Sequence, residues 1–280
     1  MTSFEFPSFR KDPKIVYSDD DVIVAEKPAG MHTAPNPGDD AAQSVPTLLS
    51  WVSDRYPEVA RVEGRGRGEG GLLHRLDRDT SGLVLFARGQ PAFLSLSEAS
   101  ESGAFRKEYV LRSFPSGRGL RGCRPERVSP QGVTEEEWDA LISLGAEGMP
   151  RAAALISDVV GREREIAVVG RFRAYGPGAA RVACAVPCAD LGKKKREWGS
   201  VLYRTLLLGA CVTETGDFLE FRVALTRGFR HQVRAHLAWM GFPLLGDALY
   251  GGPPSDRLYL HAASLAFPHP ATGRLLSVQG

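Results

Sequence analysis

LLHRLDRDTSGLVLFAR, residues 72–88, is the stretch of sequence that is most informative about the fold. A charged turn, HRLDRDTSG, lies between the apolar pair 72–73 and the apolar run 83–87. That run has the length and composition of a buried strand, so we expect the turn to display its side chains at the edge of a sheet. In a generic sequence, Asp77 and Asp79 would pair with Arg75 and Arg78, and DTSG would form an ordinary turn.

Strand and helix patterns mix on both sides of this turn. Short β-branched or apolar runs predict strands at 15–17, 22–25, 109–111, 206–212, 218–225 and 260–267. Helices are predicted from Thr47 to before Pro57 and at 91–100, 134–142, 150–159 and 230–240. The class is therefore α/β or α+β, and we expect one main body.

Composition indicates a folded protein of the cytoplasm. The chain has 280 residues, of which 43% are hydrophobic and 24% charged, as in ordinary globular domains. No apolar run approaches the roughly 18 residues of a membrane span, and the N-terminus lacks the pattern of a secretory leader. Four scattered cysteines are expected to be reduced thiols. Cys184 and Cys188 lie close together, but their apolar neighbours favour small buried strand residues over a zinc site.

Net charge alone does not identify a partner. It is +2, with a sequence pI of about 8.4. Basic residues nevertheless cluster in three places: Arg61, Arg65 and Arg67; Arg118, Arg121, Arg124 and Arg127; and 193–196. Contacts with phosphates explain these clusters as well as solvated loop charges do, since the acidic runs 19–21 and 135–137 can balance them.

The turn of residues 74–83 resembles the signature H-R-L-D-x-x-T-S-G-L of the RluA-type pseudouridine synthases, which modify ribosomal and transfer RNA. Further segments resemble that family's blocks in the same order: DVIVAEKPAGM at 21–31, KEY at 107–109, HQVRAHL at 231–237, GFPLLGD at 241–247, LYG at 249–251 and LHAA at 260–263. The resemblance is good over 15–112 and 200–270 and poor between them.

The resemblance implies a fold and an activity. The fold is a long, mixed, mostly antiparallel sheet with flanking helices and a central RNA-binding cleft. The activity is the isomerisation of specific uridines in structured ribosomal or transfer RNA, by a cytoplasmic monomer that needs neither cofactor nor metal.

The resemblance also assigns catalytic residues. Asp77 matches the family's aspartate, which must be ionised beside the flipped nucleotide. Arg234 matches the arginine that holds this carboxylate charged, a role that suits a permanently charged guanidinium. Tyr109 matches the tyrosine that lies against the target base. From the residues alone, Arg234 can equally be a helix-surface charge and Tyr109 a core residue of a strand.

RNA contacts are expected near these residues. Arg75 resembles the arginine that fills the space left by the extruded uridine, although it can instead only brace Asp77. The other expected RNA-binding residues lie in the matched motifs: Arg78, Lys107, Arg230, His231 and Gln232. The motif histidines show no metal-ligand spacing and are interpreted as hydrogen-bonding scaffold: His74, His231, His236 and His261.

The sequence departs from the family pattern in three ways. The opening hairpin begins at residue 15, so we expect no N-terminal RNA-binding domain of the S4 type. The match fades over about 113–199, an inserted region that either recognises RNA or packs as an appendage. Residues 226–232 read TRGFRHQ where the family has T-G-R-T-H-Q, so the loop before Arg234 is one residue longer.

Two other classes of function remain open. The chain can be an RNA-binding or ribosome-assembly protein without turnover, which intact Asp77 and Arg234 argue against. It can also be a glycoside- or nucleoside-cleaving enzyme that uses Asp77 and Asp79 as a carboxylate pair. Activity on polymeric RNA alone would exclude the second class.

Overall fold

The computed structural model describes residues 6, 11–35, 45–66, 68–115, 126–128, 145–161, 166–175, 180–185 and 201–280. The chain divides into two compact units. We call Pro7–Glu108 with His261–Gly280 the Asp77 unit, and Met1–Phe6 with Tyr109–Leu260 the Arg234 unit. The chain passes between them within β4 (Arg106–Ser113) and at the start of β10 (Leu260–Pro268).

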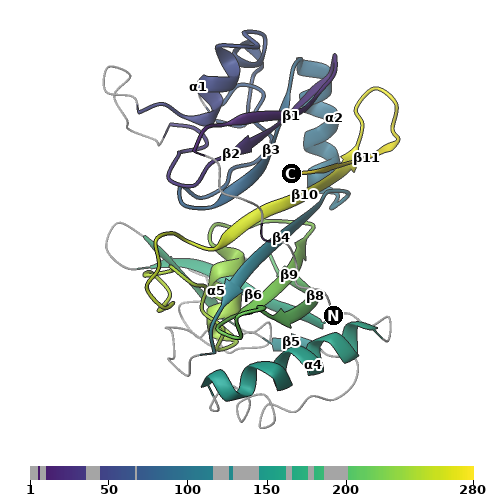
Figure 1. Cartoon of the computed structure of the whole chain (residues 1–280). Coiled ribbons are helices and arrows are strands. Elements are labelled where there is room, and N and C mark those ends of the chain that lie inside the picture. Colours follow the sequence, from purple (N-terminus) through teal and green to yellow (C-terminus); the bar gives the residue numbers. More distant parts are fainter. Residues whose placement is uncertain are drawn as a thin grey trace. The chain divides into compact units, whose positions relative to one another are not determined.

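The Asp77 unit is a sheet with α2 (Gln90–Glu101) beside it (Figure 1). β1 (Lys14–Ser18), β2 (Val22–Lys27) and β3 (Ser81–Ala87) pair antiparallel in that order. β10 pairs parallel with β3, and β11 (Leu275–Gln279) pairs antiparallel with β10. The core contains side chains from β2, β3, α2 and β10, among them Val24, Leu85, Phe93, Leu96 and Phe267.

Local sequence explains these elements. α1 (Leu48–Ser53) begins with a capping box, in which Thr47 and Ser50 bond each other's backbone amides. Val59–Arg61 form one 3₁₀ turn. Gly82 has φ +116, and a Cβ there would lie 2.3 Å from the carbonyl oxygen of Ala262. Only glycine therefore allows β3 and β10 to approach this closely.

The Arg234 unit is built on an antiparallel sheet. β9 (Leu219–Leu225), β8 (Tyr203–Val212), β6 (Ile166–Tyr175) and β5 (Glu126–Val128) are neighbours in that order, and β7 (Arg181–Ala185) also pairs with β6. α4 (Met149–Gly161) follows a 3₁₀ turn at Gly145–Gly148, and its Ser157 hydroxyl donates to the Ala210 carbonyl of β8. α5 (Gln232–Trp239) packs against β7 and β8 (Figure 1).

The mixed α/β class with a mostly antiparallel sheet is confirmed. The predicted strands and the helices after Thr47 and at 91–100, 150–159 and 230–240 are present, with ends shifted by up to three residues. The last helix begins at Gln232, because His231 is in the left-handed region. Other predictions lie outside the described residues: the helix at 134–142, the basic group 193–196, the side chains of the second arginine cluster, and Cys188. Cys184 is buried in β7, as expected for a small strand residue.

Within the described part of the chain, no helix has the length and apolar character needed to cross a bilayer. The central RNA-binding cleft and the organisation of the chain as one main body stay predictions.

Candidate active site

The backbone of the Asp77 loop is held by the segment that follows β2. The buried Lys27 ammonium donates to the carbonyls of Pro28, Met31 and Arg78 at 2.9, 2.8 and 2.9 Å. The Arg78 carbonyl also accepts from the Gly30 amide at 2.9 Å. These bonds fix the residue directly after Asp77.

The residue before Asp77 is fixed in the same way. The Thr33 hydroxyl donates to the Leu76 carbonyl at 2.8 Å and accepts from the Leu76 amide at 3.1 Å. The Asp77 carbonyl accepts from the Thr80 amide at 3.1 Å, which closes the turn into β3. Asp77 is half-buried, whereas Asp79 is exposed. The sequence thus places one partly desolvated carboxylate on a backbone that is restrained on both sides.

The arginines around Asp77 have partners in the same unit. Arg75 is exposed, and its Nη1 lies 3.3 Å from Glu69 Oε1 while its Nη2 donates to the Ala34 carbonyl at 3.3 Å. Arg78 is also exposed, and its Nε donates to the Gly30 carbonyl at 3.2 Å. Both guanidinium groups therefore lie at the surface beside the loop.

Lys107 lies in the interior of the Asp77 unit and is only 8% exposed. Burial first, and then the charge of Arg65, lower the pKa of Lys107 to about 8. Burial, with Lys107 and Arg65 nearby, also lowers the pKa of His74 well below its usual range. This burial does not favour a phosphate contact by Lys107, and its role in RNA binding stays a prediction.

Lys107→Met is expected to stabilise the fold at neutral pH. The pKa of Lys107 falls from 10.5 to about 8 on folding, so between these values the unfolded chain holds a proton that the folded chain has lost. Wild-type free energy of unfolding should therefore rise with pH across this window, by up to about 3 kcal/mol. Urea unfolding at pH 8 and pH 10.5 measures the slope, which Lys107→Met should remove and the exposed Lys14→Met should keep. A wild-type stability that is flat between these pH values contradicts the expectation.

Arg234 is buried and bound by an aspartate of its own unit. Its Nε and Nη2 lie 2.7 Å from Oδ2 and Oδ1 of Asp247, and the side chains are 7% and 0% exposed. The helix-surface interpretation of Arg234 is therefore wrong. Tyr109 lies on β4 at 7% exposure.

The start of α5 orders the residues before Arg234. Among the residues that the structure describes, His231 alone other than glycine has positive φ, at 55°. Gln232 is buried; its side chain accepts from the Phe229 amide and donates to the Arg204 carbonyl and the Thr205 hydroxyl. These bonds give Gln232 a structural role, and its contact with RNA stays a prediction. Arg230 is exposed.

The motif histidines make the hydrogen bonds expected of a scaffold. These are His74 Nε2 with the Leu85 amide, His231 Nδ1 with the Tyr250 hydroxyl, His236 Nδ1 with the Thr205 hydroxyl and His261 Nδ1 with the Ser81 hydroxyl. Burial lowers the pKa of His236 to about 3, so its ring is neutral.

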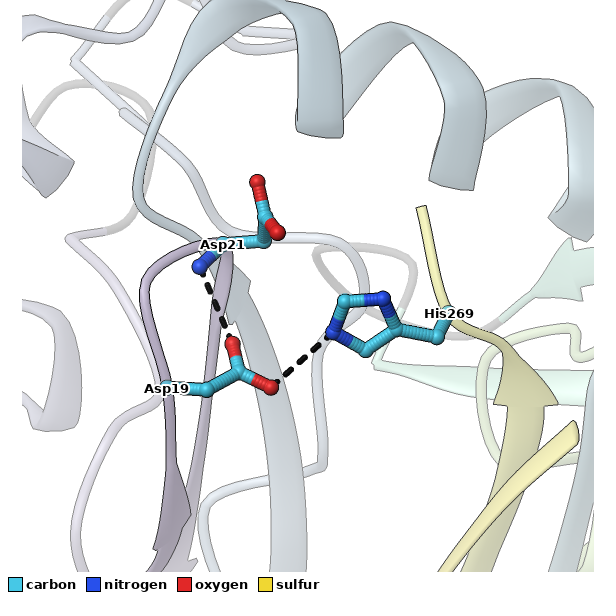
Figure 2. Close-up of side chains that lie close together, drawn as sticks. All are labelled: Asp19, Asp21 and His269. Carbon is cyan, nitrogen blue, oxygen red and sulfur yellow. Dashed lines mark hydrogen bonds and ion pairs between the residues drawn. The ribbon is translucent and has the colours of Figure 1, made fainter. Parts of the chain in front are cut away.

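One cluster of potential metal ligands occurs among the described residues: Asp19, Asp21 and His269 (Figure 2). Asp19 Oδ1 accepts from the amides of Asp21 and Val22, and Oδ2 accepts from the Tyr17 hydroxyl and His269 Nε2. His269 Nδ1 accepts from the Ala271 amide, so Nε2 carries the proton.

These contacts are more typical of a hydrogen-bonded turn than of a metal centre. Burial alone would raise the pKa of Asp19, but its hydrogen bonds lower it to about 2. All four lone-pair positions of this carboxylate are engaged by donors. The cluster links the β1–β2 turn to the segment after β10 by a hydrogen bond. The expected lack of a metal site stays a prediction.

The predicted site residues fall into two sets, one in each unit. Asp77, Arg75, Arg78 and Lys107 belong to the first, and Tyr109, Arg230, His231, Gln232 and Arg234 to the second. Residues 21–239 match the model of the RNA pseudouridylate synthase family. The chain belongs to this family. The resemblance drawn from the motifs is thereby confirmed.

Known pseudouridine synthases match most of the chain. An uncharacterized RNA pseudouridine synthase of Chloroflexus aurantiacus is 31% identical over 89% of this chain and 59% of its own length. The ribosomal large subunit pseudouridine synthase D of Vibrio parahaemolyticus is 27% identical over 94% of this chain and 65% of its own length. The chain thus spans less than two thirds of the length of these relatives.

Solved pseudouridylate synthase domains share the fold. Human RNA pseudouridylate synthase domain containing 1 matches with a TM-score of 0.56 at 18% identity, over 98% of this chain and 85% of the other. The human domain containing 4 protein also has a TM-score of 0.56, at 15% identity, over 95% and 87%. At these identities the likeness concerns the fold alone.

Sequence reasoning missed the residues that support the site. Lys27, Thr33, Asp247 and Tyr250 all lie in or beside family-like segments, yet none was assigned a role. Lys27 had one available signal, because it ends a strand whose first four residues, 22–25, are apolar. A lysine in that position is buried only when its ammonium has partners.

Proposed function

We propose that this chain isomerises specific uridines in structured ribosomal or transfer RNA to pseudouridine, with Asp77 as the catalytic carboxylate. Membership of the RNA pseudouridylate synthase family supports the reaction, and the names of the relatives support an RNA substrate. The observation that carries the proposal is the position of Asp77. It is a half-buried carboxylate on a restrained loop, inside the matched segment.

The chemistry requires no second substrate. The C1′–N1 glycosidic bond of the uridine breaks, a C1′–C5 bond forms, C5 loses its proton and N1 gains one. No electrons are transferred to or from another molecule, so no redox cofactor is needed. An ionised Asp77 can attack the base, attack the sugar or abstract a sugar proton, and the proposal requires only that it is charged beside the nucleotide.

The other catalytic assignments rest on the family motif. Arg234 keeps the Asp77 carboxylate ionised, since a guanidinium holds its charge at any physiological pH. Tyr109 lies against the target base, and Arg75 fills the stack that the uridine leaves. Extrusion of a base costs a few kcal/mol, which stacking and phosphate contacts offset. The exposed side chains of Arg75, Arg78 and Arg230 suit such contacts.

The finer assignments belong to the same proposal. His231, Lys107 and Gln232 complete the RNA-binding set, and the enzyme works as a cytoplasmic monomer without metal or cofactor. Among the described residues, the one cluster of potential metal ligands has two of its three side chains, Asp19 and His269, hydrogen-bonded to each other, which is compatible with that assignment.

The test uses the purified chain and total RNA from a strain that lacks the corresponding gene. Pseudouridine is mapped by carbodiimide-dependent stops of reverse transcription. A new stop in ribosomal or transfer RNA supports the proposal and identifies the target uridine. RNA binding without any stop favours the non-catalytic class, and turnover of free uridine or oligosaccharide favours the hydrolytic class.

A further inference from the structure

The guanidinium of Arg234 is held by two side chains from the same turn. Asp247 binds it through two oxygens, each 2.7 Å from a guanidinium nitrogen. The ring of Tyr250 lies beside it, with its centroid 5.3 Å from Arg234 Cζ. A bidentate pair sets the plane of a guanidinium, and an aromatic ring attracts the same cation. The orientation of Arg234 is therefore set from within its own unit.

Asp247 is itself rigidly placed. Its Oδ1 accepts from the Leu249 amide at 3.2 Å, and its carbonyl accepts from the amides of Tyr250 and Gly252 at 3.3 and 2.9 Å. Gly246 has φ +79, and a Cβ there would meet the Arg257 carbonyl oxygen at 1.7 Å. The turn is thus packed too tightly for Asp247 to move away from Arg234.

Tyr250 connects this turn to β7 in the inserted region. Its hydroxyl accepts from the Val182 amide at 2.8 Å and lies 3.0 Å from His231 Nδ1. Because the hydroxyl already accepts from an amide, its own hydrogen is available for the ring nitrogen of His231. Tyr250 is 2% exposed. It belongs to a core cluster that also contains Phe172, Val182 and Cys184 of β6 and β7, and Ala235, Ala238 and Trp239 of α5.

We infer that Asp247 and Tyr250 are positioning residues, which hold the Arg234 guanidinium in one orientation for the isomerisation, and that the β6–β7 hairpin of the inserted region supports them. The inference rests on the proposed function and deepens it. The Asp247 pair occupies Nε and Nη2 and thereby fixes the direction of the opposite edge of the guanidinium. A displaced cation would stabilise the Asp77 carboxylate less well, because electrostatic catalysis depends on groups already in place.

The positioning variants keep the shape of each side chain. Asp247→Asn removes the charge, and Tyr250→Phe removes the hydroxyl but keeps the ring. A misplacement of about 1 Å costs about a hundredfold in rate, so Asp247→Asn should lower kcat by about that factor with little change in KM for RNA. Tyr250→Phe should lower kcat less. Asp256→Asn, at an exposed neighbouring aspartate, should match wild type.

A double-mutant cycle separates positioning from a general structural effect. If Asp247 acts through Arg234, adding Asp247→Asn to Arg234→Lys should lower kcat no further than Arg234→Lys alone. Thermal unfolding confirms that each variant is folded at the assay temperature. The inference is overturned if the kcat losses of the two single variants multiply in the double variant. It is also overturned if Asp247→Asn is folded and has the kcat of wild type. An inactive but folded wild type overturns the proposed function instead, and the inference with it.

Discussion

Asp77→Asn is expected to abolish pseudouridine formation while leaving the fold and the dissociation constant for RNA unchanged. Asparagine has the shape of aspartate but cannot be ionised, so each proposed role of the carboxylate is lost. The side chain is half-buried, and the backbone bonds that shape the loop come from other groups: Lys27, Gly30, Thr33, Leu76 and Thr80. Reverse-transcription stops measure the activity, and filter binding measures the affinity for RNA.

Asp79→Asn is the matched control for Asp77→Asn. Asp79 lies two residues further along the same turn and is exposed. Full activity of Asp79→Asn identifies Asp77 as the one essential carboxylate of the turn. Equal loss in both variants, accompanied by release of free uracil from wild type, would instead indicate a carboxylate pair that hydrolyses the glycosidic bond. Persistent stops with Asp77→Asn contradict the catalytic assignment outright.

Lys27→Met is expected to lower the free energy of unfolding by about 3 kcal/mol or more and to impair catalysis with it. The ammonium of Lys27 is fully buried and bonded to three carbonyls. Methionine fills a similar volume but removes the donor to the Pro28 and Met31 carbonyls and leaves the Arg78 carbonyl with the Gly30 amide alone. Each buried group left unsatisfied costs about 1–3 kcal/mol. Urea unfolding followed by circular dichroism measures the loss.

Lys14→Met provides the comparison for Lys27→Met, because Lys14 is an exposed lysine of the adjacent strand β1. Its unfolding midpoint should stay at the wild-type value. If Lys27→Met unfolds at the same urea concentration as Lys14→Met, the carbonyls around position 27 have found other donors. The loop before β3 would then not depend on this ammonium.

Local pattern predicted most of the elements in the described chain. Thr47 starts α1, and the largely apolar run at 218–225 marks β9, because caps and apolar runs are properties of neighbouring residues. The left-handed conformation of His231 was not predicted, since it depends on tertiary contacts such as the hydrogen bond with Tyr250. No sequence signal marks the point within β4 at which the chain passes from one unit to the other, because the sequence of that strand is continuous.

The supporting contacts of the site were out of reach of sequence reasoning for a physical reason. Lys27 bonds to the carbonyl of Arg78, which is 51 residues away, and backbone carbonyls carry no signature in a sequence. Asp247 pairs with Arg234 across the turn that follows α5. The resemblance identified both motifs, but it could not tell that one holds the other. Pairing of this kind is decided by tertiary packing.

The parallel pairing of β3 with β10 has a consequence for synthesis of the chain. The strand that follows the Asp77 turn leaves the ribosome early, but its neighbour β10 is made only after the whole Arg234 unit. Until β10 has been synthesised, the edge of β3 that pairs with it stays unpaired in the nascent sheet. Unpaired strand edges tend to pair with other chains. A protein of this topology depends on fast completion or on a chaperone during that interval, and removal of residues 261–280 should leave it prone to aggregation.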